Sequence, residues 1–303
     1  MHAWEQIQKT VDHIETHLAE EIRMDDLARC AALSPFYFQR LFHRLVGKPV
    51  QEYVKLRRLA GAANALQERE DRILDIALAL GFSSHEVLTR AFKSTYGMTP
   101  EEFRANPVRL CHFNKPQLLL QYALVDENVP LIADGIVLEI SRRQLSAPLQ
   151  FVGLTVEATV GQLPGNGEPQ VDGLSDVWDE FHRRKPHLQG LKENGDELGV
   201  AFEGTKPGHY RYFGGSESEH GVVTEGCSIW ELPAGAYVTC TFEAENFEQL
   251  VTDALFKAQR YLFEMWLPRH GLSCMPFAVE RYASHSPETT CMEVWVAPVP
   301  IQA

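Results

Sequence analysis

The amino-acid sequence predicts a two-domain fold: an all-α double helix-turn-helix domain followed by an α+β domain. Three observations predict it. A length of 303 residues exceeds what one ordinary hydrophobic core organises. The first hundred residues repeat themselves at an offset of about fifty, with the apolar spacing of helices. After Asn106-Pro107 this spacing gives way to alternating apolar and polar residues, which is typical of strands.

The repeat in the first hundred residues is one helical unit used twice. Residues Ser34–Phe42, followed by Gly47, correspond to Ser84–Phe92, followed by Gly97. Ser34 suits the N-cap of a helix, and the two glycines suit helix C-caps. A shorter apolar stretch and a turn precede each of these helices. Each copy is therefore predicted to form a helix, a short turn and a second helix.

The second helix of each copy has an apolar and a polar face. In the first copy Phe38, Leu41, Phe42 and Leu45 share one side, which predicts burial. The opposite side carries an aromatic ring, an amide and a guanidinium, and such side chains read base edges in a major groove. The candidate DNA-reading residues are Phe36, Gln39, Arg40 and His43 in the first copy, and His85, Glu86, Thr89, Arg90 and Lys93 in the second.

A helical stretch from Val50 to Gln67 connects the two copies. A helix of this length spans about 27 Å. It could hold two reading helices about one DNA turn, or roughly 34 Å, apart. The alternative is a plain helical bundle whose exposed faces are merely solvated. The second copy of reader-type residues at a fixed offset argues against that alternative.

The net charge of −13 is unevenly distributed. Residues 1–108 contain 14 basic and 15 acidic residues, whereas residues 109–303 contain 14 and 26. The acidity therefore belongs almost wholly to the second part. A near-neutral first domain can bind DNA if its cations gather on one face.

Composition is typical of a globular protein and excludes several other classes. Hydrophobic residues make up 45% and charged residues 23% of the chain. No apolar run approaches the roughly 20 residues that span a bilayer, and the first residues lack the regions of a secretory signal. The six cysteines are far apart and the twelve histidines lack metal-ligand spacing. We therefore expect a cytoplasmic protein with no membrane partner, no metal and no cofactor.

The first domain resembles the DNA-binding domain of the AraC/XylS family of transcriptional regulators over residues from about 5 to 106. The matching residues are Leu27-Ala28, the Ser34–Phe42 helix, Gly47, Tyr53, Arg57-Leu59, Ile76-Ala77, Gly81-Phe82, Arg90-Ala91-Phe92-Lys93 and Gly97-Met98-Thr99-Pro100 with Phe103-Arg104. The resemblance implies that the two reading helices enter adjacent major grooves of double-stranded promoter DNA. Glu86 is a departure, because a carboxylate repels phosphate. It either accepts a hydrogen bond from cytosine or leaves more of the affinity to the first helix.

The second part alternates strands with two helices. Strand-like runs occupy residues 136–140, 151–158, 198–202, 210–213, 228–232, 237–242, 277–284 and 292–297, and helices occupy 174–182 and 247–266. This order predicts an α+β domain of two strand-helix-strand repeats, each with a helix on an antiparallel sheet. We assign residues 1–107 to the double helix-turn-helix domain, 108–134 to a linker and 135–300 to the second domain.

The second domain resembles the GyrI-like effector-binding domain. The resemblance rests on the run from Ile229 to Tyr237, on Trp266-Leu267-Pro268 with Gly271, and on Ala278-Val279-Glu280-Arg281-Tyr282. It implies a small-molecule effector in a cleft between the two halves, with Glu280 facing a cationic ligand.

Glu280 lies in an apolar strand, where a buried carboxylate is costly without a partner. Its functional role would be the counter-charge of an organic cation, aided by aromatic faces. Tyr282 shares its side of the strand. The other candidate ligand-binding residues are Trp178, Tyr212, Trp230 and Trp295. Alternatively, Glu280 pairs with Arg281 or Arg211, and each aromatic residue is ordinary core.

The two domains together predict a sequence-specific transcription regulator, not an enzyme, that senses a small cationic or amphipathic molecule. The ligand would shift the arrangement of the domains or stabilise a form that recruits RNA polymerase, and it must bind the two states differently. Two alternatives stay open. One is a GyrI-like hydrolase of electrophilic small molecules fused to a DNA-binding domain, with Glu280 as its base. The other is a second domain that binds another protein.

Overall fold

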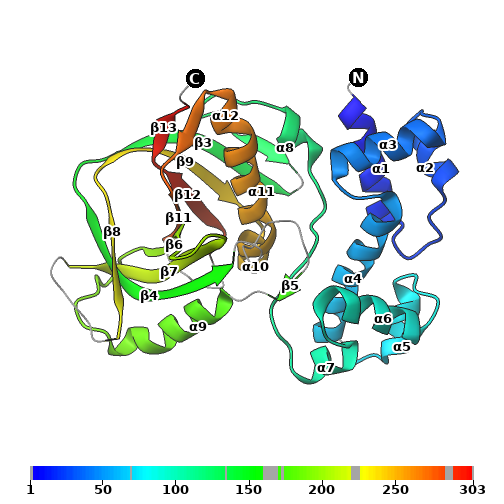
Figure 1. The fold of residues 1–303 in the computed structure, drawn as a ribbon, viewed down its shortest axis with the longest axis horizontal. Coiled ribbons are helices and arrows are strands. Elements are labelled where there is room, and N and C mark those ends of the chain that lie inside the picture. The colour runs from blue at the N-terminus through cyan, green and yellow to red at the C-terminus, as the bar shows by residue number, and fades with distance from the viewer. Residues whose placement is uncertain are drawn as a thin grey trace. The chain divides into compact units, whose positions relative to one another are not determined.

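The computed structural model describes residues 3–68, 70–133, 135–159, 170–171, 174–219, 226–283 and 289–301 (Figure 1). The chain divides into two compact units. The first comprises Met1–Leu119 with Gly165–Asp172, and the second comprises Leu120–Pro164 with Gly173–Ala303. Within the described ranges, no helix has the length and apolar character that crossing a membrane requires.

The first unit is helical and contains the predicted repeat. Its helices are α1 (Ala3–Thr16), α2 (Met24–Cys30), α3 (Pro35–Val46), α4 (Val50–Glu68), α5 (Ile73–Ala79), α6 (His85–Tyr96) and α7 (Pro100–Ala105). Helices α2 and α3 form one helix-turn-helix, and α5 and α6 form the other. The predicted double helix-turn-helix is confirmed.

Helices α3 and α6 begin and end with the same local chemistry. The Ser34 hydroxyl accepts a hydrogen bond from the Tyr37 amide (3.4 Å), and the Ser84 hydroxyl accepts one from the Val87 amide (3.3 Å). Gly47 and Gly97 end the helices with φ of 79° and 80°, a left-handed conformation that glycine adopts without steric cost. The sequence repeat is therefore a repeat of helix boundaries.

Helix α4 belongs to two hydrophobic cores. Val50, Tyr53, Val54 and Leu56 pack with the first helix-turn-helix, where Phe38 and Phe42 are fully buried. Leu59, Ala62, Ala63 and Leu66 pack with the second, around Leu88 and Phe92. Because α4 contributes to both cores, its length sets the separation of the two helix-turn-helices.

The segment after α7 differs from the predicted 108–134 linker. Leu110, in the short strand β1 (Leu110–Cys111), packs in the second of these cores, and Phe113 and Leu118 pack in the first. Arg57 donates a hydrogen bond to the Phe113 carbonyl (2.9 Å). Apolar side chains at these positions explain why residues 108–119 belong to the first unit. Further on lie α8 (Leu118–Tyr122) and β2 (Leu131–Ala133), and β2 joins the sheet of the second unit.

The second unit contains a nine-stranded antiparallel sheet in the order β2-β3-β9-β12-β11-β6-β7-β4-β8. Its strands after β2 are β3 (Ile136–Leu145), β4 (Leu149–Thr159), β6 (Glu197–Glu203), β7 (His209–Ser218), β8 (Ser228–Leu232), β9 (Gly235–Glu243), β11 (Phe277–Tyr282) and β12 (Cys291–Val296). Outside this sheet, β5 (Gln170–Val171) pairs with β1, and β10 (Leu272–Cys274) pairs with β13 (Pro298–Pro300).

Two helical segments pack on this sheet (Figure 1). Helix α9 (Ser175–Arg184), followed by a 3₁₀ turn at Lys185–His187, contacts β4 and β7. The second segment contacts β9 and β12 and runs through α10 (Phe247–Gln249), α11 (Leu255–Arg260) and α12 (Leu267–Arg269), with π-helical turns at Leu250–Ala254 and Tyr261–Trp266. The predicted α+β architecture, with strands and a helix in each half, is confirmed.

The two halves meet at the central pair β6 and β11 and exchange their outer strands. The β3 strand pairs with β9 of the second half, and β8 pairs with β4 of the first. Only residues 146–148 connect β3 to β4, and only 233–234 connect β8 to β9, although each pair is far apart in the strand order. Such short connections require the sheet to curl until its two ends approach each other.

Glycines allow this close packing of β4 and β7. A Cβ atom at Gly153 would lie 2.1 Å from the Gly214 carbonyl oxygen and 2.5 Å from the Gly215 Cα. No rotamer relieves a clash between a Cβ and a backbone, so a larger residue must separate the two strands. Gly153 is therefore required by backbone packing and not by a turn.

We predict that Gly153→Ala destabilises the second unit by about 1–3 kcal/mol, the usual cost of overpacking. Urea unfolding followed by tryptophan fluorescence measures this, because Trp178, Trp230, Trp266 and Trp295 all lie in the second unit. Gly61→Ala in α4 is the control, since its added Cβ would meet only the flexible end of Leu80, at 3.2 Å. Equal unfolding midpoints for Gly153→Ala and the wild type would contradict the packing argument.

Candidate nucleic-acid interface and small-molecule site

The polar face of α3 is fully presented to solvent. Phe36, Gln39, Arg40 and His43 are all exposed, and Phe36 is 65% exposed. The Arg40 guanidinium carbon lies 5.6 Å from the centre of the Phe36 ring. A large exposed aromatic ring next to a cation has the chemistry of a surface that binds a partner. The structure brings these four sequence-predicted residues together on one helix face.

Tyr37 is an exposed neighbour that sequence reasoning missed. Its side chain is also 65% exposed, and its ring lies edge-on to Phe36 with the ring centres 5.8 Å apart. The helical period could have found it, because Tyr37, Arg40 and Arg44 recur at i, i+3 and i+7. The exposed face of α3 therefore extends beyond the four predicted residues to Tyr37 and Arg44.

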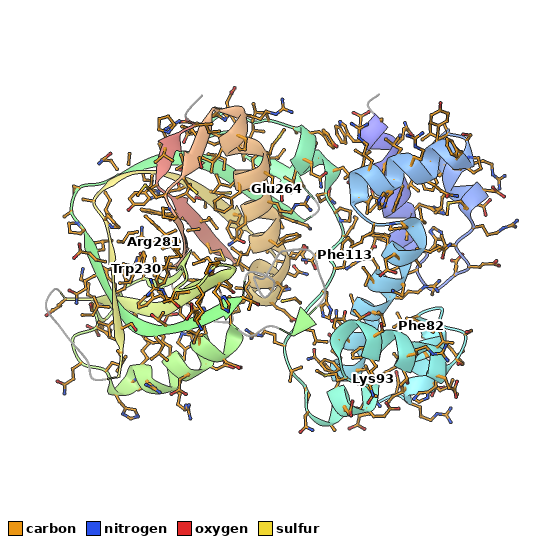
Figure 2. All side chains as sticks on the ribbon, in the orientation of Figure 1. Phe82, Lys93, Phe113, Trp230, Glu264 and Arg281 are labelled. Atoms are coloured by element: carbon orange, nitrogen blue, oxygen red, sulfur yellow. The ribbon has the colours of Figure 1, made fainter. Side chains whose placement is uncertain are left out.

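The corresponding face of α6 is more restricted. Glu86, Arg90 and Lys93 are exposed, and Figure 2 shows Lys93 on this helix. His85 and Thr89 are half-buried instead of facing outward as predicted. The reason at His85 is α7, whose Glu101 carboxylate lies 2.7 Å from the His85 Nε2. The Thr89 hydroxyl oxygen is buried and has no hydrogen-bond partner among the described residues.

The two helices also differ in charge. Helix α3 has no acidic residue in its first turn, and its exposed side chains include Arg40, His43 and Arg44. On α6, hydrogen bonds from the Ser84 hydroxyl and the backbone lower the pKa of Glu86, which holds it as a carboxylate. A phosphate backbone is attracted to cations and repelled by this carboxylate. The exposed face of α3 is therefore the more electropositive of the two.

In the second unit, Glu280 lies in a cluster of aromatic and polar side chains. The Tyr212 hydroxyl donates to Glu280 Oε2 (2.8 Å), and the Tyr282 hydroxyl donates to the same oxygen (3.4 Å). The Gln259 amide donates to Glu280 Oε1 (3.1 Å). The Trp178 indole N–H donates to the Tyr212 hydroxyl (3.1 Å). Four of the sequence-predicted ligand residues are therefore joined in one hydrogen-bonded group, which we call the Glu280 cluster: Glu280, Tyr282, Tyr212 and Trp178, with Gln259.

Strand register and helix packing assemble the Glu280 cluster. Glu280 on β11 pairs with Gly199 on β6, and Gly199 pairs with Gly214 on β7. A Cβ at Gly214 would meet Val177 and Trp178, so this face of the sheet is the one that α9 covers. Gln259 reaches the cluster from α11, between two π-helical turns of a kind often found at functional sites. The cluster lies at the seam between the two halves.

Burial holds the cluster's hydroxyls as hydrogen-bond donors. Trp178, Tyr212 and Tyr282 are buried. Burial and the nearby Glu280 carboxylate raise the pKa of both tyrosines well above the ordinary value, so both stay protonated. A Cβ at Gly199 would lie 2.2 Å from the Tyr212 hydroxyl oxygen, and only glycine leaves room for the Tyr212–Glu280 contact. The arrangement presents a carboxylate beside aromatic rings and protonated donors.

The two arginines considered as partners of Glu280 contact other groups. Arg281 Nε donates to the Asp196 carboxylate (2.6 Å), and Arg211 Nε donates to the Glu203 carbonyl (3.1 Å). Arg281 lies between Glu280 and Tyr282 in the sequence, and Arg211 directly precedes Tyr212. Successive strand residues point to opposite faces of a sheet. The alternation that gives Glu280 its aromatic neighbours therefore directs these two guanidinium groups to the other face.

The structure does not bring Trp230 and Trp295 into the Glu280 cluster. Both pack with Val279 and Leu198 on the opposite face of the sheet, and Figure 2 marks Trp230 there. The Trp230 ring centre lies 4.8 Å from that of Phe202, and the Trp295 indole N–H donates to the Glu293 carboxylate (2.8 Å). Sequence reasoning had no register with which to separate the two faces, and for the same reason it missed Gln259 and Gly199.

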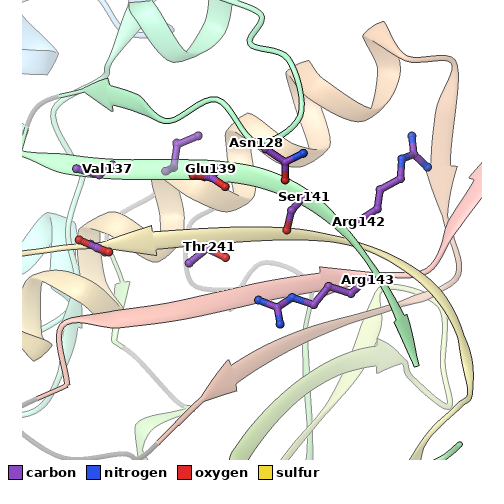
Figure 3. A pocket seen from close by; sticks show the side chains of 9 residues that line it. Asn128, Val137, Glu139, Ser141, Arg142, Arg143 and Thr241 are labelled. Carbon is purple, nitrogen blue, oxygen red and sulfur yellow. The ribbon is translucent and has the colours of Figure 1, made fainter. Parts of the chain in front are cut away.

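A separate polar hollow of about 440 Å³ lies along β3 and β9 (Figure 3). Its lining includes Glu139, Ser141, Arg143 and Thr241. Arg143 donates to the Glu293 carboxylate (2.7 Å), which is the group that also binds Trp295. None of the sequence-predicted ligand residues lines this hollow.

Comparison with known proteins matches both units. Residues 27–106 match the family described as a helix-turn-helix domain, and residues 157–297 match the GyrI-like small molecule binding domain. YbfP of Bacillus subtilis, an uncharacterized HTH-type transcriptional regulator, is 46% identical over 98 residues, which are 32% of this chain and 33% of YbfP. The match thus spans about a third of that relative.

Two further proteins match more of their own length. The probable transcription factor PqrA of Proteus vulgaris is 44% identical over 95 residues, which are 31% of this chain and 78% of PqrA. The crystal structure of an AraC-type transcriptional regulator from Chromobacterium violaceum is 29% identical, covers 35% of this chain and 96% of that chain, and has a TM-score of 0.33. By the two family matches and the match to PqrA, the chain belongs to the AraC/XylS family of transcriptional regulators, and it carries a GyrI-like domain behind its double helix-turn-helix.

Proposed function

We propose that this protein regulates transcription by binding promoter DNA through α3 and α6, and that it responds to a small molecule bound at the Glu280 cluster. The observation that carries the proposal is the exposed Phe36, Gln39 and Arg40 face of α3, repeated in position on α6. Such a regulator acts in the cytoplasm, where bacterial promoters are. The family membership of the chain supports the same function.

The α3 face carries the larger share of base reading. Arg40 suits the O6 and N7 acceptors of guanine, and Gln39 suits the N6 and N7 edge of adenine. Phe36 and Tyr37 offer apolar contact to thymine methyl groups. On α6, Arg90 and Lys93 supply cations, and Glu86 opposes them. The DNA site is therefore expected to have one strongly and one weakly specified box.

We predict that selection from a random duplex pool enriches a bipartite site, with boxes about one helical turn apart. Arg40→Ala should lose specificity at one base pair of the stronger box, with an affinity loss of about 1–3 kcal/mol, because a bidentate guanine contact is removed. The control is Arg269→Ala, which removes an exposed arginine from the second unit. If Arg40→Ala enriches the wild-type site unchanged, Arg40 does not read a base of that site.

The Glu280 cluster suits an organic cation with an apolar body. The Glu280 carboxylate can offset a positive charge, and the Trp178 and Tyr282 rings offer faces to the remainder of the ligand. To act as an effector, the molecule must bind two states of the protein with different affinity. A contact that stabilises a form recruiting RNA polymerase would meet this requirement.

We predict that Glu280→Gln weakens the binding of a fluorescent lipophilic cation tenfold or more, or about 1.4 kcal/mol, and leaves a neutral dye of similar size unaffected. Fluorescence titration measures both dyes. Glu264→Gln is the matched control, because Glu264 is an exposed carboxylate of the same unit that pairs with Arg260 (Figure 2). Equal affinity of Glu280→Gln and the wild type for the cation would refute the counter-charge role.

A chromatographic assay with the same two proteins, wild type and Glu280→Gln, separates sensing from hydrolysis. Chromatography of an electrophilic test compound after incubation with the wild-type protein should recover it unchanged if the unit only binds. Conversion that disappears in Glu280→Gln would instead favour the hydrolase alternative, with Glu280 as the base.

A further inference from the structure

A single arginine joins the two helix-turn-helix units. Arg58 is near the middle of α4, and its guanidinium makes three hydrogen bonds of 2.7 Å. Nε donates to the Leu18 carbonyl, and Nη2 donates to the Glu20 carbonyl, both in the segment that leads into α2. Nη1 donates to the Gly81 carbonyl, in the turn between α5 and α6. The planar Arg58 guanidinium therefore binds the backbone of both helix-turn-helices.

Gly81 is adapted to this contact. Its φ is +77°, which glycine adopts freely and other residues rarely do. A Cβ at Gly81 would lie 2.8 Å from the Arg58 guanidinium carbon and 2.9 Å from the Ala19 carbonyl oxygen. The α5–α6 turn of the second helix-turn-helix thus approaches both Arg58 and the backbone that leads into the first helix-turn-helix as closely as atoms allow. The contact is tight from both sides.

This contact adds a polar connection to the hydrophobic packing that the two helix-turn-helices share. The two cores each have their own set of side chains, and they share α4. A shared helix fixes the distance between the units along its axis, but bending or twisting of that helix would still rotate α6 relative to α3. Arg58 connects the two helix-turn-helices at a point away from the axis of α4, and such a connection resists their rotation relative to each other. Segment 108–119 provides another tie, because Leu110 packs in the core of the second helix-turn-helix and Phe113 and Leu118 pack in that of the first.

We propose that Arg58 sets the relative placement of α3 and α6 and thereby determines which spacing between two DNA boxes the protein accepts. The proposal rests on the proposed DNA-reading function. Arg58 is a positioning residue in it, because the contacts that define its role are with backbone carbonyls and not with bases. Two reading helices enter successive major grooves only if their separation and angle match the helical turn of DNA.

The neighbourhood of Arg58 makes the proposal testable without unfolding the protein. A hollow of about 310 Å³ lies beside it, lined by Ala19, Glu20, Gln51 and Gly81 among others. When the guanidinium is removed, water in this hollow can hydrogen-bond to the three carbonyl oxygens. Those oxygens are then not left unsatisfied. We therefore expect Arg58→Met, which keeps much of the apolar stem, to fold.

The experiment measures affinity for duplexes in which the two selected boxes are separated by the natural spacing and by one or two base pairs more or fewer. Duplexes with a single box are measured beside them. The wild type is expected to prefer one spacing about tenfold or more, because both helices bind together only there. Arg58→Met is expected to reduce this preference to about threefold or less, and to change single-box affinity by less than about twofold.

Three further variants sharpen the result. Gly81→Ala disturbs the contact from the other side and is expected to reduce the spacing preference in the same way. Arg58→Lys keeps the charge but only one compact donor group, and an intermediate preference is expected. Lys55→Gln is the control on the same helix. Lys55 forms an ion pair with Glu52 one helical turn away, so this variant should behave as the wild type. Circular dichroism and thermal unfolding establish which variants are folded.

The outcomes distinguish the proposal from the function on which it rests. A folded Arg58→Met with the wild-type spacing profile overturns it. Loss of single-box and two-box affinity by the same factor also overturns it, because Arg58 would then only support one unit's fold. If Arg58→Met does not fold, a wild-type profile in Arg58→Lys and Gly81→Ala overturns it in turn. A wild-type protein that binds neither box contradicts the DNA-reading function itself, and the spacing proposal falls with it.

Discussion

Helix α4 is the constraint on which the DNA-binding unit depends, because its side chains are buried in two cores at once. Val54 belongs to the core of the first helix-turn-helix and Ala63 to that of the second, and a rigid helical rise separates them. Helix α4 therefore fixes the distance between the two helix-turn-helices along its axis. Arg58 adds orientation to this fixed distance through the backbone of both units.

The two reading helices are built alike and equipped differently. Both have a serine cap and a left-handed glycine end. On α3 the exposed aromatic rings and Arg40 are free to meet a groove, whereas on α6 the contact with Glu101 occupies His85 and Glu86 adds a negative charge. Duplication of a fold unit thus leaves room for unequal duties. In the proposed function, α3 would be the stronger DNA contact and α6 the weaker one, and the affinity would depend on how the two helices are positioned.

The second unit solves a different problem, which is how to place a carboxylate among aromatic rings. Glu280 is stabilised by hydroxyl and amide donors, and those donors are in turn fixed by Trp178 and by strand register. Gly199 matters as much as any of them, since a side chain there would occupy the space of the Tyr212 hydroxyl. In the proposed function, this carboxylate is the group that a cationic effector would meet.

The sequence by itself determined the class of both units, the helix-turn-helix repeat and the polar face of α3, and it named Glu280 and Tyr282 as candidate site residues. These follow from local periodicity, capping residues and short motifs, which are legible in a single chain. Tertiary structure alone decided that Trp178 and Tyr212 join Glu280 while Trp230 and Trp295 lie on the other face, and that residues 108–119 pack with the first unit. It also decided the contacts of Gln259, Gly199 and Arg58. Strand register and long-range packing set these, and neither is encoded in the spacing of residues along the chain.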